Sequence, residues 1–146
     1  MMPWTAGRFR DEVILFARVL LIVLFVVFGW SKLTNYSGTM GYMARTGVPV
    51  PSVAALVAIV VEFFVALAVG FGACTRSLSL LLAFYTFATA LIGHHFWTMD
   101  GADRAANAIN FYKNLSIIGG FLLLYVTGAG RYSVDARLGS AEANAR

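Results

Sequence analysis

VAALVAIVVEFFVALAVGFGA, residues 53–73, is an almost unbroken apolar run with a single carboxylate, Glu62, at its centre. A run of this length matches the thickness of the hydrocarbon core of a bilayer. A carboxyl group at mid-depth is costly unless it faces the interior of a helix bundle and finds partners there. The run therefore predicts a membrane bundle that folds around a polar interior.

The composition of the chain supports a membrane location. Hydrophobic residues make up 60% of the 146 residues and charged residues 12%, with a mean hydropathy of +0.77. Soluble domains carry about 25% charged residues, so a soluble fold would have too little polar surface to cover itself. The net charge of +4 is spread over the ends of apolar runs rather than gathered on one face. We therefore expect a single membrane domain and no nucleic-acid partner.

Four apolar runs are long enough to cross a bilayer, and they cover about residues 13–30, 52–72, 78–97 and 111–127. They predict an all-α protein, an antiparallel bundle of four transmembrane helices. In the first loop, Tyr36, Met40 and Met43 recur at helical spacing, which predicts a short amphipathic helix at the membrane interface. The C-terminal residues 131–146 are expected to form a mobile tail.

The basic residues predict the orientation. With four spans, both termini and the loop at residues 73–77 lie on one side, together with Arg8, Arg10, Arg76, Arg131, Arg137 and Arg146. The loops on the other side hold only Arg45 and Arg104. The positive-inside rule then predicts a multi-pass protein of the bacterial inner membrane with cytoplasmic N- and C-termini.

The motifs of covalent catalysis are missing from the sequence. The one cysteine, Cys74, allows no intrachain disulfide and no CxxC pair. His94 and His95 would point about 100° apart on a helix, so they cannot chelate one metal as an i, i+4 pair does. Haem or a metal would need a second protomer or a partner. We therefore expect no metal site and no catalysis by this chain alone.

Several polar residues lie within or beside the apolar runs and are candidates for binding a ligand. Intramembrane ionisable residues are functional candidates by default. Asn107, Asn110 and Asn114 share one helix face. Lysine and histidine would hydrogen-bond ligand oxygens, and Glu62 could exchange a proton. The candidate ligand site comprises Lys32, Glu62, His94, His95, Asn110, Lys113 and Asn114.

Two other interpretations of the polar residues remain open. In the first, Glu62 is structural and forms an ion pair with Arg18 or Lys113, so that the protein is a non-catalytic scaffold or assembly factor. In the second, an aqueous path through the bundle conducts protons or small solutes. The apolar half of the fourth span argues against such a path.

Short motifs along most of the chain carry a family resemblance. They are ARVL (17–20), FGWSKL (28–33), GYM (41–43), GVPVP (47–51), VEF (61–63), GACTR (72–76), HHFW (94–97), FYKNL (111–115) and GRYSVD (130–135). Together they resemble the DoxX family of small bacterial and archaeal membrane proteins. The chain departs from the family pattern at residues 62–66, where relatives usually carry glycines soon after the glutamate. Whether a close helix contact forms there is left open.

The resemblance implies four transmembrane helices and a link to redox chemistry. The family takes its name from a subunit associated with an archaeal thiosulfate:quinone oxidoreductase, and other members are associated with oxidative-stress systems. The leading hypothesis is therefore a membrane subunit or accessory protein of a quinone-linked redox system. Its expected ligand is a quinone or a lipid headgroup. Its expected partners are the lipid bilayer and either another protein subunit or further copies of itself.

Overall fold

The structure, a computed structural model, describes residues 9–144 and is helical throughout. Its elements are α1 (Arg10–Thr34), α2 (Tyr36–Arg45), α3 (Pro51–Ile59), η2 (Val60–Val65), α4 (Ala66–Phe71), α5 (Thr75–Gly93), η3 (Phe96–Thr98), α6 (Gly101–Thr127) and α7 (Val134–Asn144). Four helical segments are long and apolar enough to span a membrane: Arg10–Thr34, Pro51–Phe71, Thr75–Thr98 and Gly101–Thr127. The predicted all-α bundle of four transmembrane helices is confirmed.

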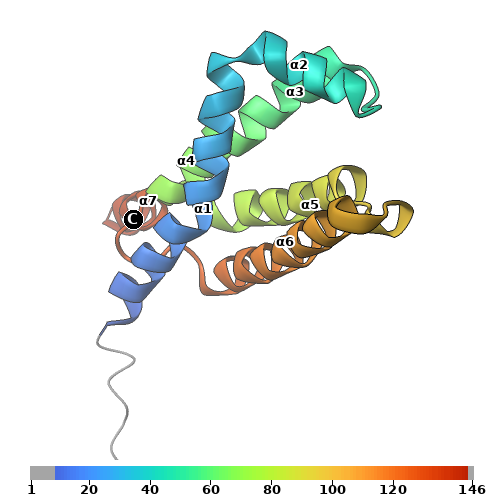
Figure 1. Ribbon diagram of the computed structural model, residues 1–146. Coiled ribbons are helices and arrows are strands. Elements are labelled where there is room, and N and C mark those ends of the chain that lie inside the picture. The colour runs from blue at the N-terminus through green and yellow to red at the C-terminus, as the bar shows by residue number, and fades with distance from the viewer. Residues whose placement is uncertain (1–8, 145–146) are drawn as a thin grey trace, which may run out of the picture.

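The spans form two helix pairs that make a V (Figure 1). In the first pair, α1 packs against the continuous helix α3–η2–α4, and in the second α5 packs against α6. The pairs meet near α7 and the turn between α4 and α5, which we call the terminal end. They diverge toward α2 and η3, which we call the open end.

The buried core lies where the two pairs meet. Phe25 of α1 and Phe121 of α6 contact edge to face, with ring centroids 5.4 Å apart, and Leu82 of α5 completes the contact. Only 11–33% of the apolar window of each span is buried, so most large apolar side chains face outward. In a membrane these side chains contact lipid, and the fold needs a core only between helices.

A buried arginine holds the terminal end together. Arg18 is 1% exposed, and its Nε donates a hydrogen bond to the carbonyl of Gly70 at 3.1 Å. Its Nη1 and Nη2 donate to the carbonyls of Ala129 and Tyr132, the latter at 2.7 Å. One side chain of α1 thus binds the end of α4 and the loop that precedes α7.

Asp135, at the start of α7, caps the N-terminus of α5. Its carboxylate accepts hydrogen bonds from the backbone N–H groups of Cys74 at 2.7 Å and Thr75 at 2.9 Å. Burial opposes ionisation of this carboxyl. The hydrogen bonds from Thr75 and Cys74 and the charge of Arg18 nevertheless hold the pKa of Asp135 below its usual value. Two N–H groups that a helix start leaves unpaired are satisfied in this way.

Several expected boundaries differ from the structure. The segment expected to be a mobile tail contains α7, which the Asp135 contacts tie to α5. The third span ends its regular helix at Gly93, and α6 begins at Gly101, well before residue 111. The helix expected in the first loop is present as α2. Arg8 and Arg146 lie outside the described residues, and the orientation in the membrane stays a prediction.

Candidate ligand site

A close contact between α1 and η2 positions the central carboxylate. Gly29 is buried, and a Cβ added there would lie 2.7 Å from the carbonyl carbon of Glu62 and 2.7 Å from the backbone nitrogen of Phe63. The missing glycines after Glu62 are therefore compensated by a glycine on the facing helix. Glu62 itself lies in a π-helical turn, a distortion that is frequent at functional sites. Lys32, one turn beyond Gly29, is brought beside Glu62.

Glu62 is the centre of a hydrogen-bonded network that joins the two helix pairs. Its Oε2 accepts from Lys32 Nζ at 2.6 Å, and its Oε1 accepts from Tyr85 Oη at 2.6 Å. The side chains of Lys32 and Glu62 are 24% and 12% exposed, respectively. Lys32 and Glu62 belong to the first pair and Tyr85 to the second. The network therefore connects the two helix pairs where they begin to diverge.

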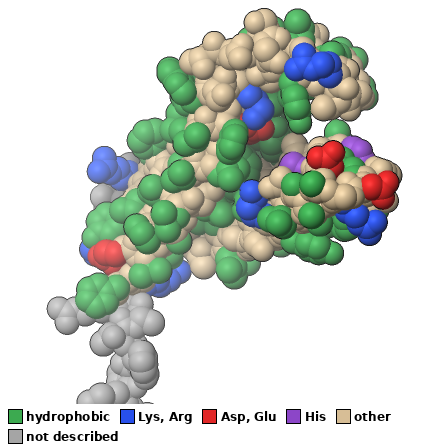
Figure 2. All heavy atoms as spheres, in the orientation of Figure 1, with side chains coloured by type: hydrophobic (Ala, Val, Ile, Leu, Met, Phe, Trp, Pro, Cys, Tyr) green, Lys and Arg blue, Asp and Glu red, His purple; other side chains and the backbone are tan. Residues whose placement is uncertain are grey.

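A cleft of about 410 Å³ lies beside this network, between the two helix pairs. Figure 2 shows the molecule hollowed between the pairs, with basic and acidic side chains on one wall and histidine near the other. The residues lining the cleft include every member of the predicted ligand site except His95. The structure therefore brings together Lys32, Glu62, His94, Asn110, Lys113 and Asn114.

His94 and His95 follow the end of α5 rather than lying on it. The Nδ1 of His94 lies 2.9 Å from Asn107 Oδ1, and Asn107 Nδ2 donates to the carbonyl of Asp103 at 3.0 Å. The second bond orients the amide, so Nδ1 of His94 carries the hydrogen. His95 instead places its Nδ1 2.9 Å from the carbonyl of Ile92 and packs against Trp97. It takes no part in the cleft.

The predicted structural ion pair between Arg18 and Glu62 is wrong. Arg18 donates to three backbone carbonyls at the terminal end, and Glu62 pairs with Lys32. Lys113, the alternative partner, donates to Asn110 Oδ1 at 2.9 Å and forms no ion pair within residues 9–144. The carboxylate is bound by the lysine near the end of α1, because the contact at Gly29 sets the register.

Sequence reasoning missed Tyr85, Thr86 and Thr89. Tyr85 binds the carboxylate, and both threonines line the cleft. Their signal was available: Tyr85 and Thr89 are polar residues four apart in an apolar span, so they share a face. Tyr42 of α2 also lines the cleft, which places α2 at its edge.

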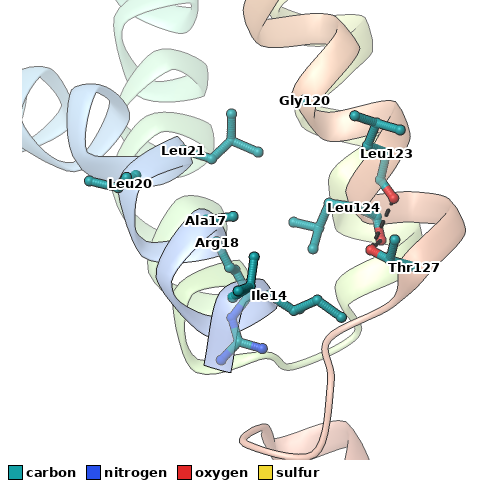
Figure 3. A pocket seen from close by; sticks show the side chains of 10 residues that line it. Ile14, Ala17, Arg18, Leu20, Leu21, Gly120, Leu123, Leu124 and Thr127 are labelled. Carbon is teal, nitrogen blue, oxygen red and sulfur yellow. Dashed lines mark hydrogen bonds between the residues drawn. The ribbon is translucent and has the colours of Figure 1, made fainter. Parts of the chain in front are cut away.

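A second groove, of about 480 Å³, lies between α1 and α6 and is almost wholly apolar. Figure 3 shows Leu21 of α1 and Leu124 of α6 facing each other across it, while the guanidinium of Arg18 points away. The hydroxyl of Thr127 donates to the carbonyl of Leu123 at 3.0 Å. Such a groove suits hydrocarbon and offers little to recognise a polar ligand. Among the described residues there is no group of three or more His, Cys, Asp or Glu side chains that could hold a metal.

Comparison with known proteins agrees with this architecture. The family model described as DoxX matches residues 13–95, which include most of α1, all of α2 to α5 and both histidines. The inner membrane protein YphA of Escherichia coli (strain K12) is 45% identical over 131 residues, 90% of this chain and 94% of that protein. The inner membrane protein YqjF of the same organism is 41% identical over 134 residues, 90% of this chain and 95% of its own.

A more distant similarity covers a smaller part of the chain. The ER-derived vesicles protein ERV29 of Saccharomyces cerevisiae is 42% identical over 60 residues, 41% of this chain and 18% of that protein. No solved structure matches the chain. The family model covers more than half of the chain, and two relatives align over nearly their whole lengths. The chain is therefore a membrane protein of the DoxX family.

Proposed function

We propose that this protein is an accessory protein of the bacterial inner membrane that binds the polar head of a membrane amphiphile in the cleft. The observation that carries the proposal is a set of lysine and amide side chains around an opening between membrane-spanning helices. The inner membrane location is supported by the printed names of YphA and YqjF.

The distribution of hydrogen bonds favours a ligand over a purely structural role. At the terminal end, all three nitrogens of Arg18 are bonded, as expected of a group that only holds the fold together. At the open end, Lys113 bonds one amide oxygen. Asn114 lines the same cleft without a hydrogen-bond partner within the described part of the chain. Unpaired polar groups in a membrane protein are costly unless something else satisfies them.

A quinone or a lipid headgroup can satisfy these donors. The carbonyl oxygens of a quinone would accept hydrogen bonds from Lys113 and the amides, and the Glu62–Tyr85 pair could exchange a proton with the ring oxygen. A role in a quinone-linked redox or oxidative-stress system follows if the ligand is a quinone. In that role a second subunit would carry the electrons to or from the quinone.

Native mass spectrometry of protein released from a mild detergent, with lipid extraction alongside, tests the proposal. We expect a stoichiometric quinone or lipid mass on the wild-type protein, reduced in Lys113→Ala. Reconstitution with and without ubiquinone in nanodiscs then separates the two ligand classes. A bare protein in both experiments would refute the proposal, and a second polypeptide in the spectrum would identify a partner.

The scaffold is the second candidate, because the Glu62 network itself ties the two helix pairs together. If the protein only holds a partner in place, Glu62→Gln lowers its thermal stability and leaves any bound mass unchanged. A loss of the bound mass in this variant, at a temperature where the protein stays folded, would favour the ligand site over the scaffold.

A further inference from the structure

The α6 wall of the cleft carries more hydrogen-bond donors than acceptors. Lys113 Nζ donates one of its hydrogens to Asn110 Oδ1, and the other two remain available. The Asn110 oxygen uses one of its two lone pairs for this bond, and the NH₂ group of Asn110 can donate to a ligand. Asn114, one turn further on, adds an amide that makes no hydrogen bond inside the described chain. This wall is therefore suited to a group rich in acceptor oxygens.

The charged side chains that line the cleft do not cancel. Lys32 and Glu62 balance each other at 2.6 Å, and both oxygens of Glu62 are occupied, the second by Tyr85. Lys113 is the remaining charge, and no carboxylate within residues 9–144 forms an ion pair with it. The two lysines and the one carboxylate that line the cleft therefore sum to one positive charge.

The opposite side of the cleft combines the mutually paired Lys32 and Glu62 with an apolar stretch of α1. Leu24, Phe25 and Phe28 form this stretch, and Phe25 is part of the buried core. A molecule that fills the cleft would therefore meet hydrocarbon beside a neutralised ion pair on one side, and an uncompensated cation with amide donors on the other. Those surroundings match an amphiphile whose head is charged.

We propose that the cleft selects amphiphiles with an anionic oxygen-rich head, a carboxylate or a phosphate ester. The ammonium of Lys113 pairs with the anion, and the amides of Asn110 and Asn114 donate to its oxygens. An unpaired cation among membrane helices gains more from an anion than from a neutral acceptor, because the surrounding dielectric is low. This inference rests on the proposed function and chooses the charged headgroup among its ligand classes.

The test compares two lipids with the same acyl chains, one with a net negative head and one with a zwitterionic head. Wild-type protein is reconstituted with equal amounts of dioleoyl phosphatidylglycerol and dioleoyl phosphatidylcholine, and retained lipid is read by native mass spectrometry. We expect about tenfold more of the anionic lipid on the protein. Lys113→Gln should remove the preference, and Lys113→Arg should restore it. Arg104→Gln, on the same helix but outside the cleft, should leave it unchanged and controls for general surface charge.

Each outcome has a distinct meaning. Equal retention of the two lipids by wild-type protein overturns the anion selectivity but leaves the proposed binding function. Retention of neither lipid also overturns the inference, and the ubiquinone nanodisc experiment then decides whether the proposed binding function stands. A preference that survives in Lys113→Gln also overturns the inference. Displacement of the anionic lipid by added inorganic phosphate supports the shared oxyanion chemistry and shows that the head alone is recognised.

Discussion

The ion pair between Lys32 and Glu62 should be measurable as a coupling free energy. The two side chains are 24% and 12% exposed, with their charged atoms 2.6 Å apart. Removing one partner of a fully buried pair costs about 3–5 kcal/mol because the other charge is left unpaired. Partial exposure reduces this penalty, so we expect about 2 kcal/mol for Lys32→Met or Glu62→Gln alone. The double variant leaves no unpaired charge and should lose no more than a single variant, well short of the sum.

The assay is equilibrium unfolding in mixed micelles with an increasing fraction of a denaturing detergent, followed by helical circular dichroism. The four proteins of the cycle, including wild type, give the coupling free energy directly. A matched control pairs Glu62→Gln with Lys113→Met, because Lys113 forms no ion pair with Glu62. The two changes in this control should add.

The opposite pattern would refute the reasoning. If the Lys32–Glu62 double variant loses about 4 kcal/mol, the sum of the single losses, the two residues do not interact in the folded protein. If the coupling is instead found between Glu62 and Lys113, the register set by the contact at Gly29 is wrong.

Three further predictions concern the contacts that build the site. Gly29→Ala should destabilise the protein by about 1–3 kcal/mol because the added Cβ would lie 2.7 Å from the backbone of η2. Gly119→Ala, where an added Cβ would meet no atom within 4 Å, should be neutral or stabilising, and unfolding in mixed micelles compares the two variants. Tyr85→Phe should cost about 1.5–3 kcal/mol for the lost hydrogen bond to the carboxylate, and thermal unfolding of Tyr125→Phe, which lacks such a bond, should match wild type. Asp135→Ala should cost about 1 kcal/mol near neutral pH. Because the folded pKa of Asp135 lies below the ordinary 3.8, this difference should persist above that value and vanish as the pH falls below it; a loss independent of pH would contradict the cap.

The spans could be predicted from the sequence because bilayer thickness alone sets the length of an apolar run. Glu62 was found for the same reason, since one carboxylate in such a run is a visible anomaly. The ion-pair partner of Glu62 could not be predicted from the sequence. Arg18 and Lys32 lie on nearly the same face of α1, about 21 Å apart along the axis, and both are cations. Only the depth at which α1 meets η2 decides between them, and that depth depends on the contact at Gly29.

The helix α7 and the role of Tyr85 escaped prediction for a related reason. The α7 segment has no long apolar run, and what ties its start to the bundle is the bond from Asp135 to the backbone of residues some sixty positions earlier. Tyr85 reads as one more aromatic in an apolar span until α5 is placed against η2. The spacing of Tyr85 and Thr89 shows only that they share a face, and the packing of α5 against η2 decides that Tyr85 binds Glu62.

The two polar clusters of this protein are used differently, and that difference argues for a binding site. Arg18 is inaccessible to a ligand, because it is 1% exposed and each nitrogen of its guanidinium donates to a backbone carbonyl. Lys113 lies on an exposed stretch of α6 beside an opening, with one amide as its partner. If polar groups served only folding, the protein would be more stable with every donor of both clusters hydrogen-bonded internally, since each unsatisfied donor in a membrane costs free energy. The helix pairs instead diverge where Lys113 lies, and the room they leave is lined with donors that a ligand can satisfy.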